Sequence, residues 1–196
     1  MPRSKKAPTA YTLRISLQRS DPLIWRRVVV GGQFTLAQLH HVIQAAMGWT
    51  DAHLYEFEIG SLRYRKPHPD DWDPGDVARD ARKFRLQQLA VARDRFSYWY
   101  DFGDDWMHDI VVEAVATLDE PLTHGVCLAG ERACPPEDVG GMPGYGEMLK
   151  ALASRAGKRR DEFLEWAGRD FDAELFDRRA ANAALLRMAW NGWGRR

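Results

Sequence analysis

The chain is poor in cysteine and has no long apolar run. Only Cys127 and Cys134 occur among its 196 residues, and its N-terminus has no apolar signal core. No stretch approaches the roughly 20 consecutive apolar residues that a membrane-spanning helix needs. We therefore expect a cytoplasmic protein with no membrane association, in a reducing compartment where disulfides are rare.

The chain also lacks an excess of charge of either sign. Lys plus Arg and Asp plus Glu each total 28, so the formal net charge is zero. A protein that binds DNA non-specifically usually carries an excess of cations, which displace counterions from the phosphates. Basic residues gather only locally, at 3–6 and 155–160, and such clusters are most often solvated surface. A protein or nucleic-acid partner therefore stays open, without support from overall charge.

Three catalytic signatures are missing as well. The chain contains no HExxH, no GxSxG and no phosphate-binding P-loop, so no hydrolase, kinase or redox class is indicated by motif. Its hydrophobic content of 45% and its eight tryptophans are those of a folded protein. Its length suits one domain. We predict a disordered basic tail at 1–10, a single domain at 11–190 and a frayed tail at 191–196.

Alternation of apolar and polar residues predicts strands in the N-terminal two-thirds. One helix interrupts them, because Thr35 and Gln38 form a capping box and Gly48 is placed to end the helix in the left-handed conformation. The segment 66–80 contains three prolines and is expected to form a loop. The predicted strands cover 11–18, 23–30, 54–59, 62–64 and 84–89, together with a hairpin of 96–102 and 106–115.

Helical patterns dominate the C-terminal end. After a stretch rich in glycine and proline at 125–146, short helices are expected at 147–153 and 161–167, and a longer one is expected to be capped by Asp172. The sequence therefore predicts an α+β fold. A mostly antiparallel sheet with one inserted helix would pack against the C-terminal helices.

The chain contains two long motifs and several short ones, namely Tyr100–His108, Gly130–Gly141 with Gly144 and Tyr145, Ile24–Arg27, Gly48 and Trp49 with His53 and Leu54, and Phe171 and Asp172 with Phe176. On these residues the chain resembles the Ri-plasmid open-reading-frame-three-like family, also called insertion-element passenger proteins, over roughly 11–176. The resemblance implies a compact α+β domain of uncharacterised activity, found on mobile elements in some relatives. Many relatives have a third cysteine where this chain has Val139.

The first candidate site surrounds the hairpin turn. Asp101, Asp104, Asp105 and His108 are close in sequence, and carboxylates beside an imidazole can bind a divalent metal or act as general acid and base. The alternative is structural, because Asp also caps backbone groups and tolerates turn geometry.

The second candidate site is one loop. Zinc sites usually contain a pair of cysteines two to four residues apart, but six residues separate Cys127 from Cys134. A buried free cysteine that acts as a small hydrophobic residue is therefore the alternative. His53 or His108 could also join Cys134 in a shared site. The candidate site residues in this loop are Arg132, Cys134, Glu137 and Asp138.

A glycine-rich segment, 140–146, precedes a predicted helix. Free amides at a helix start attract anions, but the glycine spacing fits neither a Walker loop nor the dinucleotide fingerprint. The sequence therefore favours a rigid turn. Arg26, Arg27 and Gly144 are the candidate anion contacts, and pairing with the acid-rich turns would explain the two arginines equally well.

Two functional hypotheses follow. The first is a binding or accessory module without catalysis, connected with mobile elements or nucleic acid. The second is a metal-dependent, hydrolase-like enzyme that uses the turn at 101–108 and the loop at 134–138, with Asp104, His108 and Cys134 as candidate ligands for a divalent metal. A shared site requires that the two segments meet in space. A purely structural role for both segments is the remaining alternative.

Overall fold

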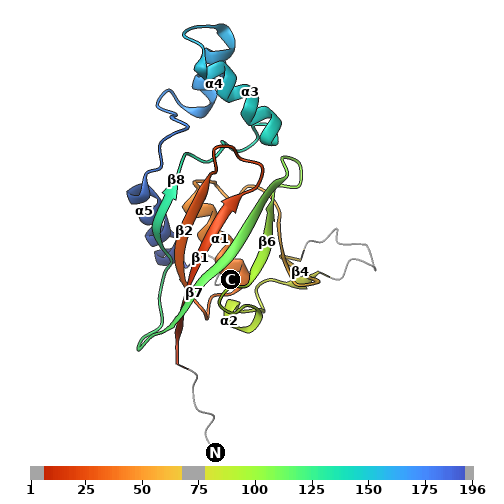
Figure 1. Cartoon of the computed structure of the whole chain (residues 1–196), viewed down its shortest axis with the longest axis vertical. Coiled ribbons are helices and arrows are strands. Elements are labelled where there is room, and N and C mark those ends of the chain that lie inside the picture. Colours follow the sequence, from red (N-terminus) through yellow and green to blue (C-terminus); the bar gives the residue numbers. More distant parts are fainter. Residues whose placement is uncertain (1–6, 68–77, 193–196) are drawn as a thin grey trace, which may run out of the picture.

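One sheet carries every strand of the molecule that the computed structural model describes, residues 7–67 and 78–192 (Figure 1). The strands are β1 Thr9–Leu17, β2 Trp25–Gly31, β3 Tyr55–Ile59, β4 Leu62–Arg65, β5 Arg79–Asp80, β6 Arg95–Tyr100, β7 Trp106–Thr117 and β8 Val126–Glu131. The helices are α1 Leu36–Met47, α2 Leu86–Leu89, α3 Gly141–Ala153, α4 Lys158–Ala167 and α5 Arg178–Trp190. The predicted α+β class is confirmed.

The sheet order is β5-β4-β3-β6-β7-β1-β2-β8. Neighbouring strands are antiparallel except β4 and β5, which pair in parallel. The longest strand, β7, lies between β6 and β1, and His108 is opposite both Tyr98 and Leu17. The β6–β7 hairpin, which carries the Tyr100–His108 motif, is therefore at the centre of the sheet.

The core lies between one face of the sheet and α1. The alternating residues Leu13, Ile15 and Leu17 of β1 are fully buried, as are Leu39 and Ile43 of α1. Helix α5 packs beside α1 and β8, whereas α3 and α4 lie beyond one end of the strands (Figure 1). None of the helices in the described residues has the length and apolar character to span a bilayer.

The signals that predicted α1 are present in the structure. The Thr35 hydroxyl accepts from the Gln38 amide at 3.2 Å, and the Gln38 side chain accepts from the Thr35 amide at 2.9 Å. Gly48 ends the helix at φ 99°. This helix end determines where the chain begins the loop that carries His53.

Several predicted boundaries were wrong. Residues 84–89 contain helix α2 instead of a strand, and strand β8 lies in the stretch that was expected to be irregular. Thr9 and Ala10 belong to β1 although they were predicted to lie in the tail at 1–10, and residues 1–6 lie outside the described part. Within the predicted loop, Arg79 and Asp80 form β5, and residues 68–77 lie outside the described part.

The C-terminal helices also begin elsewhere than predicted. Helix α3 begins at Gly141, six residues earlier than expected, and α5 is capped by Asp177. Asp172 instead forms a turn, in which its carboxylate accepts from the Glu174 amide at 2.9 Å. Asn191 follows α5, and residues 193–196 of the predicted tail are outside the described part.

Candidate functional site

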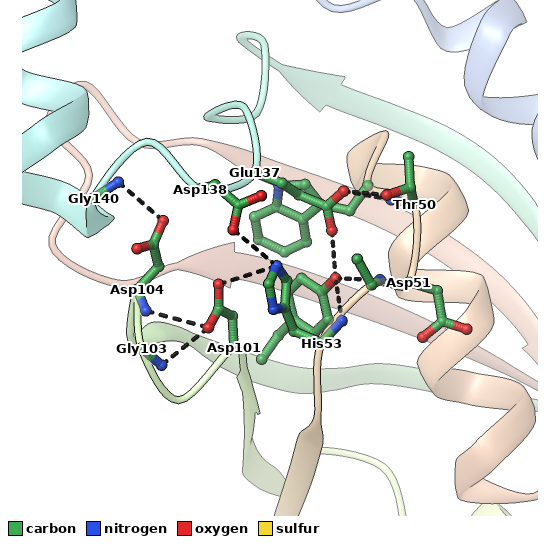
Figure 2. A network of polar contacts seen from close by, with 12 residues as sticks. Thr50, Asp51, His53, Asp101, Gly103, Asp104, Glu137, Asp138 and Gly140 are labelled. Carbon is green, nitrogen blue, oxygen red and sulfur yellow. Dashed lines mark hydrogen bonds and ion pairs between the residues drawn. The ribbon is translucent and has the colours of Figure 1, made fainter.

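Three segments that are far apart in the sequence meet at one end of the sheet (Figure 2). They are the loop after α1, the turn between β6 and β7, and the loop between β8 and α3. Trp49 Nε1 donates to the Pro135 carbonyl oxygen at 2.9 Å, and the Asp104 carboxylate accepts from the Gly140 amide at 3.1 Å. The two segments that a shared site required are therefore in contact.

The turn between β6 and β7 is built by Asp101. This residue has φ 53°, a left-handed conformation that Asp tolerates better than most side chains. Its Oδ1 atom accepts from the amides of Gly103 at 3.0 Å and Asp104 at 3.3 Å (Figure 2). The side chain is nearly buried, and its other oxygen, Oδ2, points toward His53.

The glycines of the second motif permit this close approach. At Gly141 a Cβ atom would lie 2.5 Å from the Asp104 carbonyl oxygen, and at Gly144 it would lie 1.8 Å from the Val139 carbonyl oxygen. Both separations are far too short for non-bonded atoms. The glycine-rich segment is therefore a packing element and the start of α3, whereas the sequence predicted a rigid turn before the helix.

His53 is the centre of the shared site. Its Nε2 atom lies 3.1 Å from Asp138 Oδ1 and 3.5 Å from Asp101 Oδ2. The atom is buried, yet neither contact has hydrogen-bond geometry. Asp138, with a side chain 70% exposed, opens this group to solvent. One imidazole and two carboxylates therefore converge from three segments.

Glu137 joins the same segments beside this group. Its carboxylate accepts short hydrogen bonds from the Tyr100 and Thr50 hydroxyls, and a bond from the Thr50 amide at 3.1 Å. The Tyr100 hydroxyl also accepts from the Ala52 amide at 3.1 Å. Burial and the Glu137 carboxylate raise the pKa of Tyr100, so this phenol stays protonated.

Replacing Tyr100 with Phe is expected to lower the free energy of unfolding by about 1–3 kcal/mol, because the Glu137 carboxylate and the Ala52 amide would lose a buried partner. Urea unfolding measures the change. Tyr64→Phe is the matched control, since Tyr64 is equally buried as a residue but its hydroxyl bonds none of the described residues. Equal effects of the two changes would contradict this role of the Tyr100 hydroxyl.

A second cluster lies on the other side of the same loop. Asp51 Oδ1 is 2.5 Å from His40 Nε2, and Asp51 Oδ2 is 3.1 Å from His41 Nδ1. His40 Nδ1 is 2.7 Å from the Tyr98 hydroxyl. Burial lowers the pKa of His40 to about 4, so its imidazole is neutral, whereas contacts with both histidines lower the pKa of Asp51. No sequence motif indicated this group.

The structure separates the other candidates of the first site from His53. Asp105 pairs with Arg19 at 2.7 Å on the surface, and Asp104 bonds the Gly140 amide. His108 is buried in the core, where its Nδ1 lies 3.0 Å from the Trp106 carbonyl oxygen. Its ring is edge-on to Trp49, with centroids 5.4 Å apart.

Two groups of metal-ligand type occur among residues 7–67 and 78–192: His53 with Asp101 and Asp138, and His40 with His41 and Asp51. Neither contains the predicted ligands Asp104, His108 and Cys134. Cys134 and Cys127 are free cysteines, and burial raises the pKa of the Cys134 thiol to about 12. Both are therefore protonated thiols at neutral pH.

The remaining candidate residues make contacts away from His53. Arg132 pairs with Glu174, which holds the segment before α5. Arg26 and Arg27 are consecutive in β2 and therefore face opposite sides of the sheet. Arg27 makes a two-bond pair with Glu113, with N–O distances of 2.6 and 2.8 Å, whereas Arg26 is buried. The Gly144 amide donates to the Gly140 carbonyl oxygen at 3.1 Å, so it is not available to an anion.

Comparison with known proteins identifies the same fold and sequence pattern elsewhere. The chain is 41% identical over 182 residues to the uncharacterised protein y4hQ of Sinorhizobium fredii, which covers 90% of this chain and 88% of that protein. It is 34% identical to a crystallised protein of unknown function, MM3350 from Methanosarcina mazei, with a TM-score of 0.76 over 89% of this chain and 98% of that one.

A family model also covers most of the chain, and it includes the loop after α1, the β6–β7 turn and the loop before α3. It matches residues 9–180 and is described as "Plasmid pRiA4b ORF-3-like protein". This chain belongs to the plasmid pRiA4b ORF-3-like protein family.

Proposed function

We propose that this protein binds one divalent metal ion through His53, Asp101 and Asp138, and that it is a metal-dependent enzyme of the hydrolase type. The observation that carries the proposal is the convergence of the three ligand atoms, at 3.1 and 3.5 Å from His53 Nε2 (Figure 2). A metal bound to each atom at about 2.0–2.2 Å would separate neighbouring ligand atoms by roughly 3.0–3.5 Å.

The contacts of His53 favour a cation over a hydrogen bond. An imidazole N–H between two carboxylates would normally align with one of them. Here the buried Nε2 atom aligns with neither. A metal ion placed between the three atoms would satisfy the nitrogen lone pair and would neutralise the repulsion between the two carboxylates. One nitrogen and two carboxylate oxygens suit zinc, manganese or ferrous iron.

The exposure of Asp138 leaves room for water and substrate on the metal. A cavity of about 360 Å³ is lined by Asp138 together with Arg159, Phe163 and Trp166 of α4. A bound metal lowers the pKa of its water ligand and so supplies a nucleophile at neutral pH. Arg159 could orient an anionic substrate there, beside the two aromatic rings.

A binding or accessory module without catalysis is the second reading. The reference to a plasmid in the family's description supports this reading. The reading includes a link to mobile elements or nucleic acid. It differs from the first in that a partner, not turnover, would account for the exposed site. The metal centre would then have a structural or switching role.

The test is a metal titration of chelator-treated protein. Calorimetry with zinc and with manganese is expected to show one ion per chain, and the melting temperature is expected to rise with metal because the ion binds the folded state. Assays of generic esters and phosphodiesters then test turnover. Failure to bind either metal at the one-per-chain level would overturn the proposal, and binding without turnover would favour the accessory module.

A further inference from the structure

Arg26 is a buried cation, and its hydrogen bonds to the described residues are all to backbone carbonyl oxygens. The residue is 1% exposed. Its Nε donates to the Ala46 oxygen at 2.9 Å, and its Nη1 donates to the oxygens of Trp25 at 2.8 Å and Glu131 at 2.9 Å. The Phe176 ring covers the guanidinium at 4.0 Å. These contacts fix the side chain in one position.

One nitrogen of this guanidinium is left over. Within the described ranges 7–67 and 78–192, Nη2 donates to no atom, and no carboxylate pairs with Arg26. The nearby Cys134 thiol is protonated because burial raises its pKa to about 12. A buried charge is strongly unfavourable without an opposite charge. Carbonyl dipoles offset part of this cost but provide no negative charge.

A cavity of about 400 Å³ lies against Arg26, between the end of α1 and the start of α5. Its volume is in the range of small-molecule sites. The walls are mainly apolar, and Leu175 at the cavity is 59% exposed. The Asp177 carboxylate also lines the cavity but accepts from the Arg179 and Ala180 amides of α5. The apolar wall includes Ala45, Ala46, Leu175, Phe176, Ala180 and Ala184.

We propose that this cavity binds a small carboxylic acid with an apolar body, and that Arg26 Nη2 donates to its carboxylate. The charge-assisted bond would supply the missing counter-charge, and the alanine walls would cover the apolar body. The site is separate from the proposed metal centre and does not depend on it.

Arg26 also has a structural use. The Ala46 carbonyl is in the last turn of α1, where a cation is stabilising. This hydrogen bond uses Nε and leaves Nη2 without a partner in the part of the chain that the structure describes. The two roles are therefore compatible, but replacing Arg26 would remove both at once.

The test uses hexanoate as the probe, with 1-hexanol and hexylamine as ligands of equal length and different charge. Calorimetry is expected to show one saturable hexanoate site, with the two other compounds weaker by about tenfold or more, because each lacks the charged bond. Ala184→Leu is expected to weaken hexanoate binding by about tenfold or more, because the longer side chain fills the cavity.

Ala183→Leu is the matched control, since Ala183 is an exposed neighbour on the same helix and does not line the cavity. It is expected to leave binding unchanged. Three results would overturn the inference: no saturable hexanoate binding, equal binding of 1-hexanol, or equal affinities of the Ala184→Leu and wild-type proteins. The comparison of hexanoate with 1-hexanol is made on the wild-type protein, so loss of the fold in a variant cannot imitate that result.

Discussion

Asp101→Asn is expected to weaken divalent-metal affinity by about 100-fold or more while the fold is retained. Changes to residues that merely orient metal ligands already cost about 10–100-fold, and Asp101 would be a ligand itself. Asparagine keeps the Oδ1 acceptor for the Gly103 and Asp104 amides and tolerates φ 53°. Calorimetric titration with zinc or manganese measures the affinity, and thermal unfolding without metal monitors the fold.

Asp105→Asn provides the matched control, because Asp105 is in the same turn but pairs with Arg19 on the surface. It carries the same chemical change and the same loss of charge. Its metal affinity is expected to equal that of the wild type. If both variants bound metal like the wild type, Asp101 would not be a ligand, and the centre would have to be abandoned.

Stability is expected to fall as the pH decreases from about 6.5 to 4, because burial lowers the pKa of His108 to about 4. An unfolded histidine titrates near 6.5, so in this window the unfolded chain takes up a proton that the folded chain does not. The stabilisation is therefore fully present above pH 6.5 and is lost as the pH falls. One group gives a slope of about 1.4 kcal/mol per pH unit, or roughly 3 kcal/mol over the window.

Urea unfolding at several pH values measures this slope. Burial also lowers the pKa of His40 to about 4, so His40 adds a slope in the same direction. His108→Phe keeps an aromatic ring against Trp49 and removes one titrating group. It is expected to reduce the slope by about 1.4 kcal/mol per pH unit. An unchanged slope would show that His108 is not the group responsible, whatever the variant's absolute stability.

The elements defined by local patterns were predictable from the sequence. The hairpin of β6 and β7 follows from the aromatic alternation of Phe96, Tyr98 and Tyr100, all of which are buried. Helix α1 follows from its capping box and Gly48. Each signal is complete within a few residues, so no knowledge of the tertiary fold was needed.

Elements that depend on distant partners were not predictable. Strand β8 reads VCLAGE and has no clean alternation, but it pairs with β2 along an irregular register. Helix α3 begins with glycines that the sequence reads as a turn, and these glycines fit against the β6–β7 turn and Val139. In both cases the tertiary contact decides the local structure.

The candidate site was predictable only in part, because it also depends on residues that are distant in the sequence. Asp101 and Asp138 lie in the two long sequence motifs. Their partner His53 comes from a third segment, and only the fold brings it near them. Asp104 and Asp105 are carboxylates in the same turn as Asp101, and His108 is close in sequence, yet their side chains point elsewhere. Sequence proximity in a turn does not determine which carboxylates converge on His53.

The pairing of β1 with β7 has a consequence for synthesis on the ribosome. A chain is made from its N-terminus, so β1 and β2 emerge early, whereas the strand that covers the other edge of β1 ends at Thr117. An isolated two-stranded hairpin is marginally stable at best. The β1–β2 hairpin of a nascent chain therefore keeps one edge of β1 unpaired until β7 has been translated.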